Sequence, residues 1–316
     1  IAIRRGPMKT PESGTEVFNT SFAQATAPWM VSGFPMDAGI KVYRPGGSDH
    51  QFASRLTGTE RLFTNTTAAG AANSLWKWDY MNGYINSTGA TTDQLSWNFR
   101  RAPGFFDVVC YTGTGSATTV SHNLGVAPEM MIVKRRDGGG SESWVVQHSG
   151  LTGGIGQGVS SDVIVYLQSI NPEYDSDGTF NFSPTASTFS LQNNANAQVN
   201  ASGGKYVAYL FASCPGVSKV GSYTGNGSTQ TINCGFSGGA RFVLIKRTDA
   251  NGNWTVFDTS RGINAGDDPT LYLNRTDAEQ TAFDLIDATA SGFIINEVPQ
   301  ETLNESGATY IYLAIA

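Results

Sequence analysis

The sequence predicts an all-β protein built as a tandem array of three similar β-sandwich modules with jelly-roll-like topology. Short alternating or apolar runs recur between clusters of Gly, Asn, Ser and Pro, as in antiparallel strands joined by turns. No window keeps the apolar spacing of an amphipathic helix for more than a turn or two. Long segments of the chain also repeat at nearly constant offsets, which is typical of repeated structural units.

The clearest repeat relates the middle of the chain to its C-terminal third at an offset of 112 residues. The segment Tyr111–Ser116 (YTGTGS) recurs as Tyr223–Ser228 (YTGNGS). In the same alignment Ile132–Arg135 (IVKR) recurs as Leu244–Arg247 (LIKR). After a few deletions the offset falls to 104. A more divergent copy lies upstream, where an offset of 93 places Lys41 opposite Lys134.

Proline-containing seams separate the copies. The seams Arg100–Gly104 (RRAPG) and Ala212–Gly216 (ASCPG) each follow an apolar alternating run. A proline cannot donate to a strand ladder, so it marks a sensible end for the last strand of a module. The modules are therefore expected at residues 4–102, 103–214 and 215–316. The segment Ile1–Ile3 matches Leu313–Ile315, so residues 1–3 are expected to end a preceding unit.

The second module shows the strand pattern most clearly. Seven or eight short strands within about 110 residues match a two-sheet sandwich in size. The expected strands are Phe106–Thr112, Glu129–Arg136, Ser143–His148, Asp162–Gln168, Thr179–Phe182, Thr188–Leu191 and Lys205–Ala212.

Composition excludes several classes of protein. The chain of 316 residues has a formal net charge of −6, which argues against a nucleic-acid binder. The longest apolar runs are well below the roughly 20 residues that span a bilayer, so no membrane insertion is expected. The cysteines are odd in number and widely spaced, which predicts free thiols at Cys110, Cys214 and Cys234.

Several segments of the second module resemble a repeat found in large virion proteins of marine bacteriophages and cyanophages. These segments are Phe105–Gly115, His122–Glu129, Ile132–Arg135 and Lys205–Ala212. The third module departs from the pattern, with Cys234-Gly235 in place of His122-Asn123. In that family the module is labelled tail-fibre-like and has no assigned activity. The resemblance implies a role in virion architecture or adsorption, in a virion assembled in the host bacterial cytoplasm, and it supplies no catalytic residues.

One acidic segment has the opening spacing of a calcium loop. Glu173, Asp175 and Asp177 alternate and are followed by a glycine. The twelfth position of such a loop is Pro184, so the bidentate carboxylate is missing. An acidic turn is favoured over a metal site, and no cofactor is expected.

Other candidate residues are better explained by structure than by chemistry. Catalysis by a nucleophile needs a base and an orienting group, and the repeats preserve no such set around His50, His122 or His148. Trp76 and Trp78 alternate like strand residues, which favours the core over sugar platforms. The repeated lysines are expected to lay their stems over apolar surface, with the ammonium in solvent or paired locally. They are Lys41, Lys134 and Lys246.

These observations favour a non-enzymatic virion protein, part of a tail fibre or appendage that contributes to host-surface adsorption. The expected partners are further copies of the chain, with a trimer favoured, other virion proteins and host cell-surface glycan. A capsid or tail decoration protein without receptor binding is the alternative. A polysaccharide depolymerase is less favoured, because no pair of carboxylates stands out in the sequence.

Overall fold

The protein is all-β and β-sandwich-like, as the sequence predicts. The computed structural model describes residues 9–85, 91–138, 141–155, 163–176, 183–193, 196, 198–263, 265–297 and 303–316. Two short 3-10 helices, Gly14–Glu16 and Arg55–Thr57, are the helical elements in this part of the chain. No helix among the described residues is long and apolar enough to cross a membrane. The segment Ile1–Ile3 and the expected strand Thr179–Phe182 lie outside the described residues.

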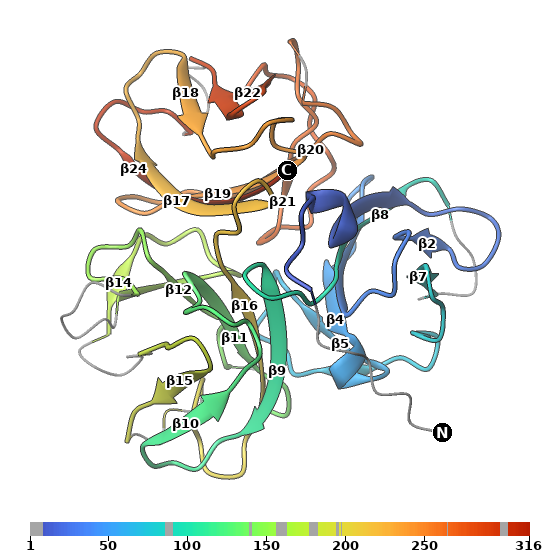
Figure 1. Ribbon diagram of the computed structural model, residues 1–316, viewed down its shortest axis with the longest axis vertical. Coiled ribbons are helices and arrows are strands. Elements are labelled where there is room, and N and C mark those ends of the chain that lie inside the picture. Colours follow the sequence, from blue (N-terminus) through green and yellow to red (C-terminus); the bar gives the residue numbers. More distant parts are fainter. Residues whose placement is uncertain are drawn as a thin grey trace.

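Three large antiparallel sheets follow one another along the chain (Figure 1). The first has the order β1 (Phe18–Phe22), β8 (Gln94–Phe99), β3 (Ala38–Tyr43), β4 (Gln51–Ser54), β5 (Glu60–Phe63) and β6 (Ala71–Ala72). The second has the order β9 (Phe106–Thr112), β16 (Lys205–Phe211), β11 (Met130–Arg135), β12 (Val145–His148), β13 (Val163–Tyr166) and β14 (Tyr174–Asp175). The third has the order β17 (Ser218–Thr224), β24 (Thr309–Ile315), β19 (Phe242–Arg247), β20 (Trp254–Asp258) and β21 (Leu271–Tyr272). In each sheet the long strand that comes first along the chain pairs with the long strand that comes last: β1 with β8, β9 with β16, and β17 with β24.

The part of the chain that forms each large sheet also forms a smaller sheet. These are β2 (Met30–Val31) with β7 (Gly83–Tyr84), then β10 (Thr118–Ser121) with β15 (Thr188–Leu191), and finally β18 (Gln230–Asn233), β23 (Gly292–Ile295) and β22 (Ile286–Thr289). Apolar clusters, one in each stretch of chain, pack between large and small sheets. The sandwich-like layering of each lobe therefore comes from a large sheet covered on one face by a small one.

The large sheets bury their other faces together, in one shared core. Five phenylalanine rings from all three sheets meet there: Phe18 and Phe99 from the first, Phe106 and Phe211 from the second, and Phe242 from the third. Their nearest ring centroids lie 4.9 to 6.4 Å apart. Figure 1 accordingly shows three lobes around a common centre. The sequence pattern did not indicate this shared core.

Burial on both faces explains the near-continuous apolar runs of the central strands. In β16, Val207 and Tyr209 face the shared core, whereas Tyr206 and Ala208 face the small sheet. A sheet with one face in solvent would show polar residues at alternate positions instead. The predicted strand ranges in the second stretch of chain agree closely with β9, β11, β12, β13, β15 and β16.

Strand pairing corrects the alignment of the first copy by one residue. Ala38 pairs with Phe99 as Met130 pairs with Phe211, so position 42 corresponds to position 134. The residue equivalent to Lys134 is therefore Val42, which is 1% exposed in the shared core. The offset of 93 that placed Lys41 there is wrong, because a shift of one residue moves a side chain to the opposite face of a strand.

The shared core predicts that the whole chain unfolds as one unit. Phe52 of β4 stacks on Tyr209 of β16 with ring centroids 3.8 Å apart, so it joins two sheets. We expect Phe52→Ala to lower the free energy of unfolding by about 3–5 kcal/mol. Calorimetry and urea titration should show one transition that shifts as a whole.

The exposed Met81 provides a control, because it is 74% exposed. Met81→Ala should change the free energy of unfolding by less than about 0.5 kcal/mol. Separate transitions for parts of the wild-type chain, with only one of them affected by Phe52→Ala, would contradict a shared core.

Candidate functional site

The most distinctive polar features of the molecule lie where one large sheet meets the next. After the strand of each large sheet that comes fourth along the chain (β5, β13 and β21), a loop reaches the neighbouring sheet through the same backbone hydrogen bond. The three bonds are Gly70 N to Arg136 O (2.7 Å), Glu173 N to Thr248 O (2.8 Å) and Glu279 N to Arg44 O (2.8 Å). They join the first sheet to the second, the second to the third and the third to the first, so the sheets form a closed ring.

A ring nitrogen donor stands at equivalent places on two of these boundaries. Trp144 Nε1 donates to the carbonyl of Phe63 over 2.9 Å, and Trp254 Nε1 donates to the carbonyl of Tyr166 over 3.0 Å. On the third boundary His50 precedes β4 as Trp144 precedes β12. The carbonyls of Tyr272 and Arg275 favour the charged form of His50, but neither of its ring nitrogens completes a hydrogen bond within the described residues. Burial prevails and lowers the pKa of His50 to about 4.

Two of the repeated lysines also cross these boundaries. Lys134 Nζ donates to the carbonyls of Thr67 (3.1 Å) and Glu142 (2.9 Å). Lys246 Nζ donates to the carbonyls of Ile170 (3.0 Å) and Arg247 (2.7 Å). Both side chains are buried, and burial lowers the pKa of each to about 8. The expectation of an ammonium in solvent or paired only locally is therefore wrong for these two lysines, since each also bonds to the neighbouring sheet.

Lys41 differs from these two lysines in position and in exposure. It is half-buried on β3, on the side of the strand away from the shared core. Burial, helped by the nearby charge of Arg61, lowers the pKa of Lys41 to about 8. The three lysines thus do not form one repeated site.

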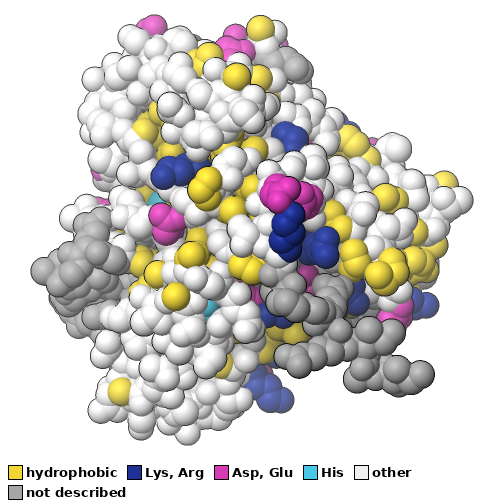
Figure 2. Space-filling view, in the orientation of Figure 1, with side chains coloured by type: hydrophobic (Ala, Val, Ile, Leu, Met, Phe, Trp, Pro, Cys, Tyr) yellow, Lys and Arg dark blue, Asp and Glu magenta, His cyan; other side chains and the backbone are white. Residues whose placement is uncertain are grey.

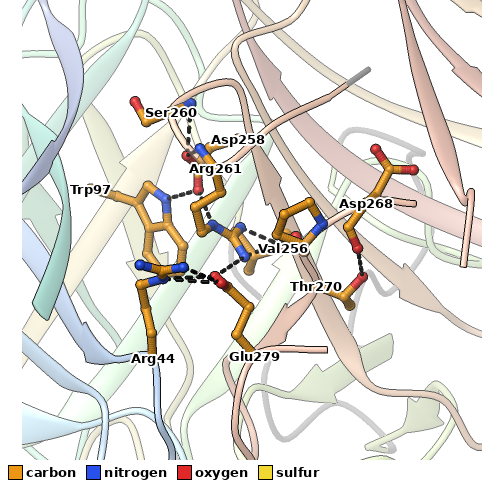
Figure 3. A network of polar contacts seen from close by, with 10 residues as sticks. Arg44, Trp97, Val256, Asp258, Ser260, Arg261, Asp268, Thr270 and Glu279 are labelled. Carbon is orange, nitrogen blue, oxygen red and sulfur yellow. Dashed lines mark hydrogen bonds and ion pairs between the residues drawn. The ribbon is translucent and has the colours of Figure 1, made fainter. Parts of the chain in front are cut away.

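The boundary between the third and first sheets holds a buried ion network (Figure 3). Arg261, which is wholly buried, donates through Nε to Asp258 Oδ2 over 2.6 Å and through Nη1 to Glu279 Oε2 over 3.4 Å. Trp97 of the first sheet donates to the same Asp258 oxygen over 3.0 Å, with the guanidinium of Arg261 5.7 Å from its ring centroid. Arg44, also from the first sheet, holds Glu279 through two nitrogens at 2.5 to 3.1 Å.

This network satisfies its buried charges within the protein. The remaining Arg261 donors reach the carbonyls of Pro269 and Val256, each over 2.9 Å. Buried guanidinium and carboxylate groups are tolerated only when they are paired and hydrogen-bonded in this way. The arrangement fixes the two sheets against each other.

The other two boundaries use different polar side chains. Between the first and second sheets, Arg136 donates two hydrogen bonds to the Glu60 carboxylate, from Nε over 2.8 Å and from Nη2 over 2.9 Å. Between the second and third, His148 Nε2 lies 3.2 Å from the carbonyl of Tyr312, while His148 Nδ1 accepts from Gly150 N over 2.9 Å. The Nδ1 contact requires an unprotonated nitrogen, so Nε2 carries the proton. Burial lowers the pKa of His148 to about 4.

Two of the acidic candidates, Glu173 and Asp175, are described, and the structure does not place these two in a group that could hold a metal ion. Glu173 Oε2 accepts from Thr152 N over 3.0 Å, and Asp175 lies two residues on in the exposed strand β14. Asp177 lies outside the described residues. Within the described residues no group of three His, Cys, Asp or Glu side chains is placed to hold a metal ion.

The predicted structural residues are placed as expected. Trp76 and Trp78 are 2% and 6% exposed and stack with Tyr84 in the outer core of the first lobe. His122 is buried, and its Nδ1 accepts from Leu124 N over 3.2 Å. The three cysteines, Cys110, Cys214 and Cys234, are free thiols.

The sequence did not single out Arg44, Arg261 or Glu279, because none of them belongs to a repeated motif. The recurrence of Trp144 as Trp254 was the available signal, since an aromatic N–H conserved between internal copies is a candidate contact between them. The indole N–H groups of Trp144 and Trp254 donate to backbone carbonyls, and the sequence does not reveal which carbonyls accept these bonds.

Residues 51–316 match a family described as a domain of unknown function, DUF7483, and the chain belongs to that family. The matched region begins at the first residue of β4 and runs to the last residue of the chain. No curated protein matches the chain.

Arg261 provides a test of the buried ion network. Arg261→Met leaves Asp258 and Glu279 buried without their shared cation, so the free energy of unfolding should fall by about 3–5 kcal/mol. The nearby Arg275, whose side chain is 50% exposed in its pair with Asp277, is the matched control. Arg275→Met should cost less than about 1 kcal/mol in urea titrations. Equal losses from the two substitutions would show that the buried network does not stabilise the closed ring.

His148 should make the stability of the protein sensitive to acid. Its pKa is about 4 when folded and near 6.5 when unfolded, so between these values the unfolded chain binds more protons. Stability from this group is present above pH 6.5 and is lost as the pH falls towards 4. The slope is at most about 1.4 kcal/mol per pH unit.

His148→Gln keeps one acceptor and one donor but does not titrate. We expect its free energy of unfolding, measured by urea titration from pH 7 to pH 4, to fall less steeply than that of the wild type. An unchanged slope would mean that His148 does not resist protonation in the folded state.

Proposed function

We propose that the chain is a non-enzymatic structural unit of a bacteriophage virion, made of three copies of one β-sandwich module that close on one another within a single chain. The copies are assigned to residues 4–102, 103–214 and 215–316. The observation that carries the proposal is the recurrence of one backbone hydrogen bond at all three sheet boundaries. A repeated contact that closes after three copies favours a fixed assembly over a flexible string.

A scaffold role fits the use that the fold makes of its buried polar groups. Lys134, Lys246 and Arg44, together with the indoles of Trp144, Trp254 and Trp97, all link one sheet to the next. Such groups hold large surfaces in a fixed orientation. The virion assignment rests on the resemblance of residues 105–115, 122–129 and 205–212 to tail-fibre-like modules.

The surface suits close packing with other proteins. Charged residues make up 15% of the chain, and Figure 2 shows few Lys, Arg, Asp and Glu side chains on the face in view, scattered among backbone and other side chains. Such a surface can be covered without burying many unpaired charges. Further copies of the chain, most simply as a trimer, other virion proteins and host cell-surface glycan are the proposed partners. A tail fibre or appendage is the leading position, and a decoration protein without receptor binding is the alternative.

Immunogold labelling of purified particles tests the proposal. Antibodies raised against this chain should label the tail or its appendages on particles of a phage that encodes it, whereas pre-immune serum should not. Label on the head shell would favour decoration. Absence of the chain from purified particles, measured by mass spectrometry, together with its presence in the soluble fraction of infected cells, would reject a virion role.

A further inference from the structure

A pocket of about 330 Å³ lies beside the loop that joins the second and third sheets. It is lined by two tyrosines, one carboxylate, an asparagine and a proline: Tyr166, Asn171, Pro172, Glu173 and Tyr174. The equivalent loops of the other two sheets hold the same backbone geometry, so they show which side chains that geometry requires. Three differences set the loop of the second sheet apart.

The first difference is an aromatic ring, that of Tyr166, on which no guanidinium of the described residues lies. In the first sheet the guanidinium of Arg61 lies 5.5 Å from the ring centroid of Phe63, and in the third that of Arg275 lies 6.0 Å from the ring centroid of Tyr272. Tyr166 is the corresponding aromatic residue of the second sheet, as the last residue of its fourth strand. Arg61 comes two residues before its aromatic partner, and the second sheet has Ile164 at that position. Arg275 comes three residues after its partner, and the second sheet has Ser169 at that position.

The second difference is a carboxylate that has lost its arginine. Glu279 and Glu173 make the same backbone hydrogen bond to the next sheet, to Arg44 and Thr248 respectively. The side chain of Arg44 grips the Glu279 carboxylate, whereas a threonine at position 248 cannot pair with Glu173 as a cation. Within the described residues Glu173 has no ion-pair partner, and Thr152 N is its hydrogen-bond donor.

The third difference is an exposed tyrosine. Tyr174 pairs with Ile164 in the second sheet, as Ala71 pairs with Arg61 in the first and Gln280 with Thr270 in the third. Alanine and glutamine at the equivalent positions show that the fold does not need an aromatic residue there. Tyr174 is nevertheless 53% exposed, so its ring is accessible to a ligand.

Around one pocket, therefore, two places that guanidinium groups occupy elsewhere in the molecule hold no cation of the described residues. Aromatic faces attract cations through their quadrupole, and a carboxylate beside them adds a full opposite charge. A neutral ligand would use the rings but leave the carboxylate without a counter-ion. We propose that the pocket lined by Tyr166, Glu173 and Tyr174 binds a compact organic cation, a substituted ammonium or guanidinium group carried by a ligand outside this chain.

Titration of the whole chain followed by ligand-observed NMR tests the proposal with choline as the probe. Its neutral carbon isostere, in which a quaternary carbon replaces the nitrogen, is the matched ligand control. Choline should show saturable binding that weakens as salt is added, and the isostere should bind at least about 5-fold more weakly. A methyl glycoside serves as a third probe.

Two variants locate the site. Tyr174→Ala introduces the residue that the first sheet already carries at that place, so folding should be retained while choline affinity falls by about 5- to 30-fold. Ser169→Arg places an arginine where the third sheet has Arg275. The new guanidinium should occupy the pocket and block choline binding. Gln280→Ala, at the position of the third sheet that corresponds to Tyr174, is the control and should leave choline binding unchanged.

Other outcomes reject the proposal. Equal binding of choline and its isostere would make the pocket an apolar site. Binding of the methyl glycoside alone would make the tyrosines a sugar platform. Choline binding that survives both Tyr174→Ala and Ser169→Arg in folded protein, or no binding of choline to the wild type, would rule out a cation site at this place.

Discussion

The architecture depends on one constraint, which is that each large sheet is apolar on both faces. One face is covered by a small sheet from the same stretch of chain, and the other needs a partner of equal size. Three such faces meet in a shared core, where aromatic rings such as Phe99, Phe211 and Phe242 contact one another across sheets. A lobe separated from the other two would expose this face, so the lobes depend on one another for stability.

Closing the ring brings polar backbone into a region that excludes water. The loop after the fourth strand of each sheet leaves carbonyl groups facing the next sheet, and buried carbonyls need donors. At two of the three boundaries Trp144, Trp254, Lys134 and Lys246 supply them. The lowered pKa of the two lysines is the electrostatic consequence, since an ammonium there loses solvation that two carbonyl contacts only partly replace.

The sequence was a good guide to strands and a poor guide to their assembly. Apolar alternation located β9 and β15 to the residue, because period and turn chemistry are local properties. It misplaced Lys41 by one position and did not indicate the shared core. Runs that are apolar on both faces show that both are buried, but they do not reveal what covers them. The pocket was missed for a related reason: Tyr174 stands out only when it is compared in space with Ala71 and Gln280.

Because one backbone geometry recurs at the three sheet boundaries, the differences between their side chains are informative. The three boundaries share a backbone geometry but differ in side chains: a buried arginine network at one, an Arg136–Glu60 pair at another, and His148 with an open pocket at the third. Where side chains serve only to hold two sheets together, different sets of residues can do so, provided that their buried charges are paired. The second loop instead keeps Glu173 and exposes Tyr174 without the arginines found elsewhere. Closure alone does not explain that combination, and a ligand that supplies the missing positive charge does.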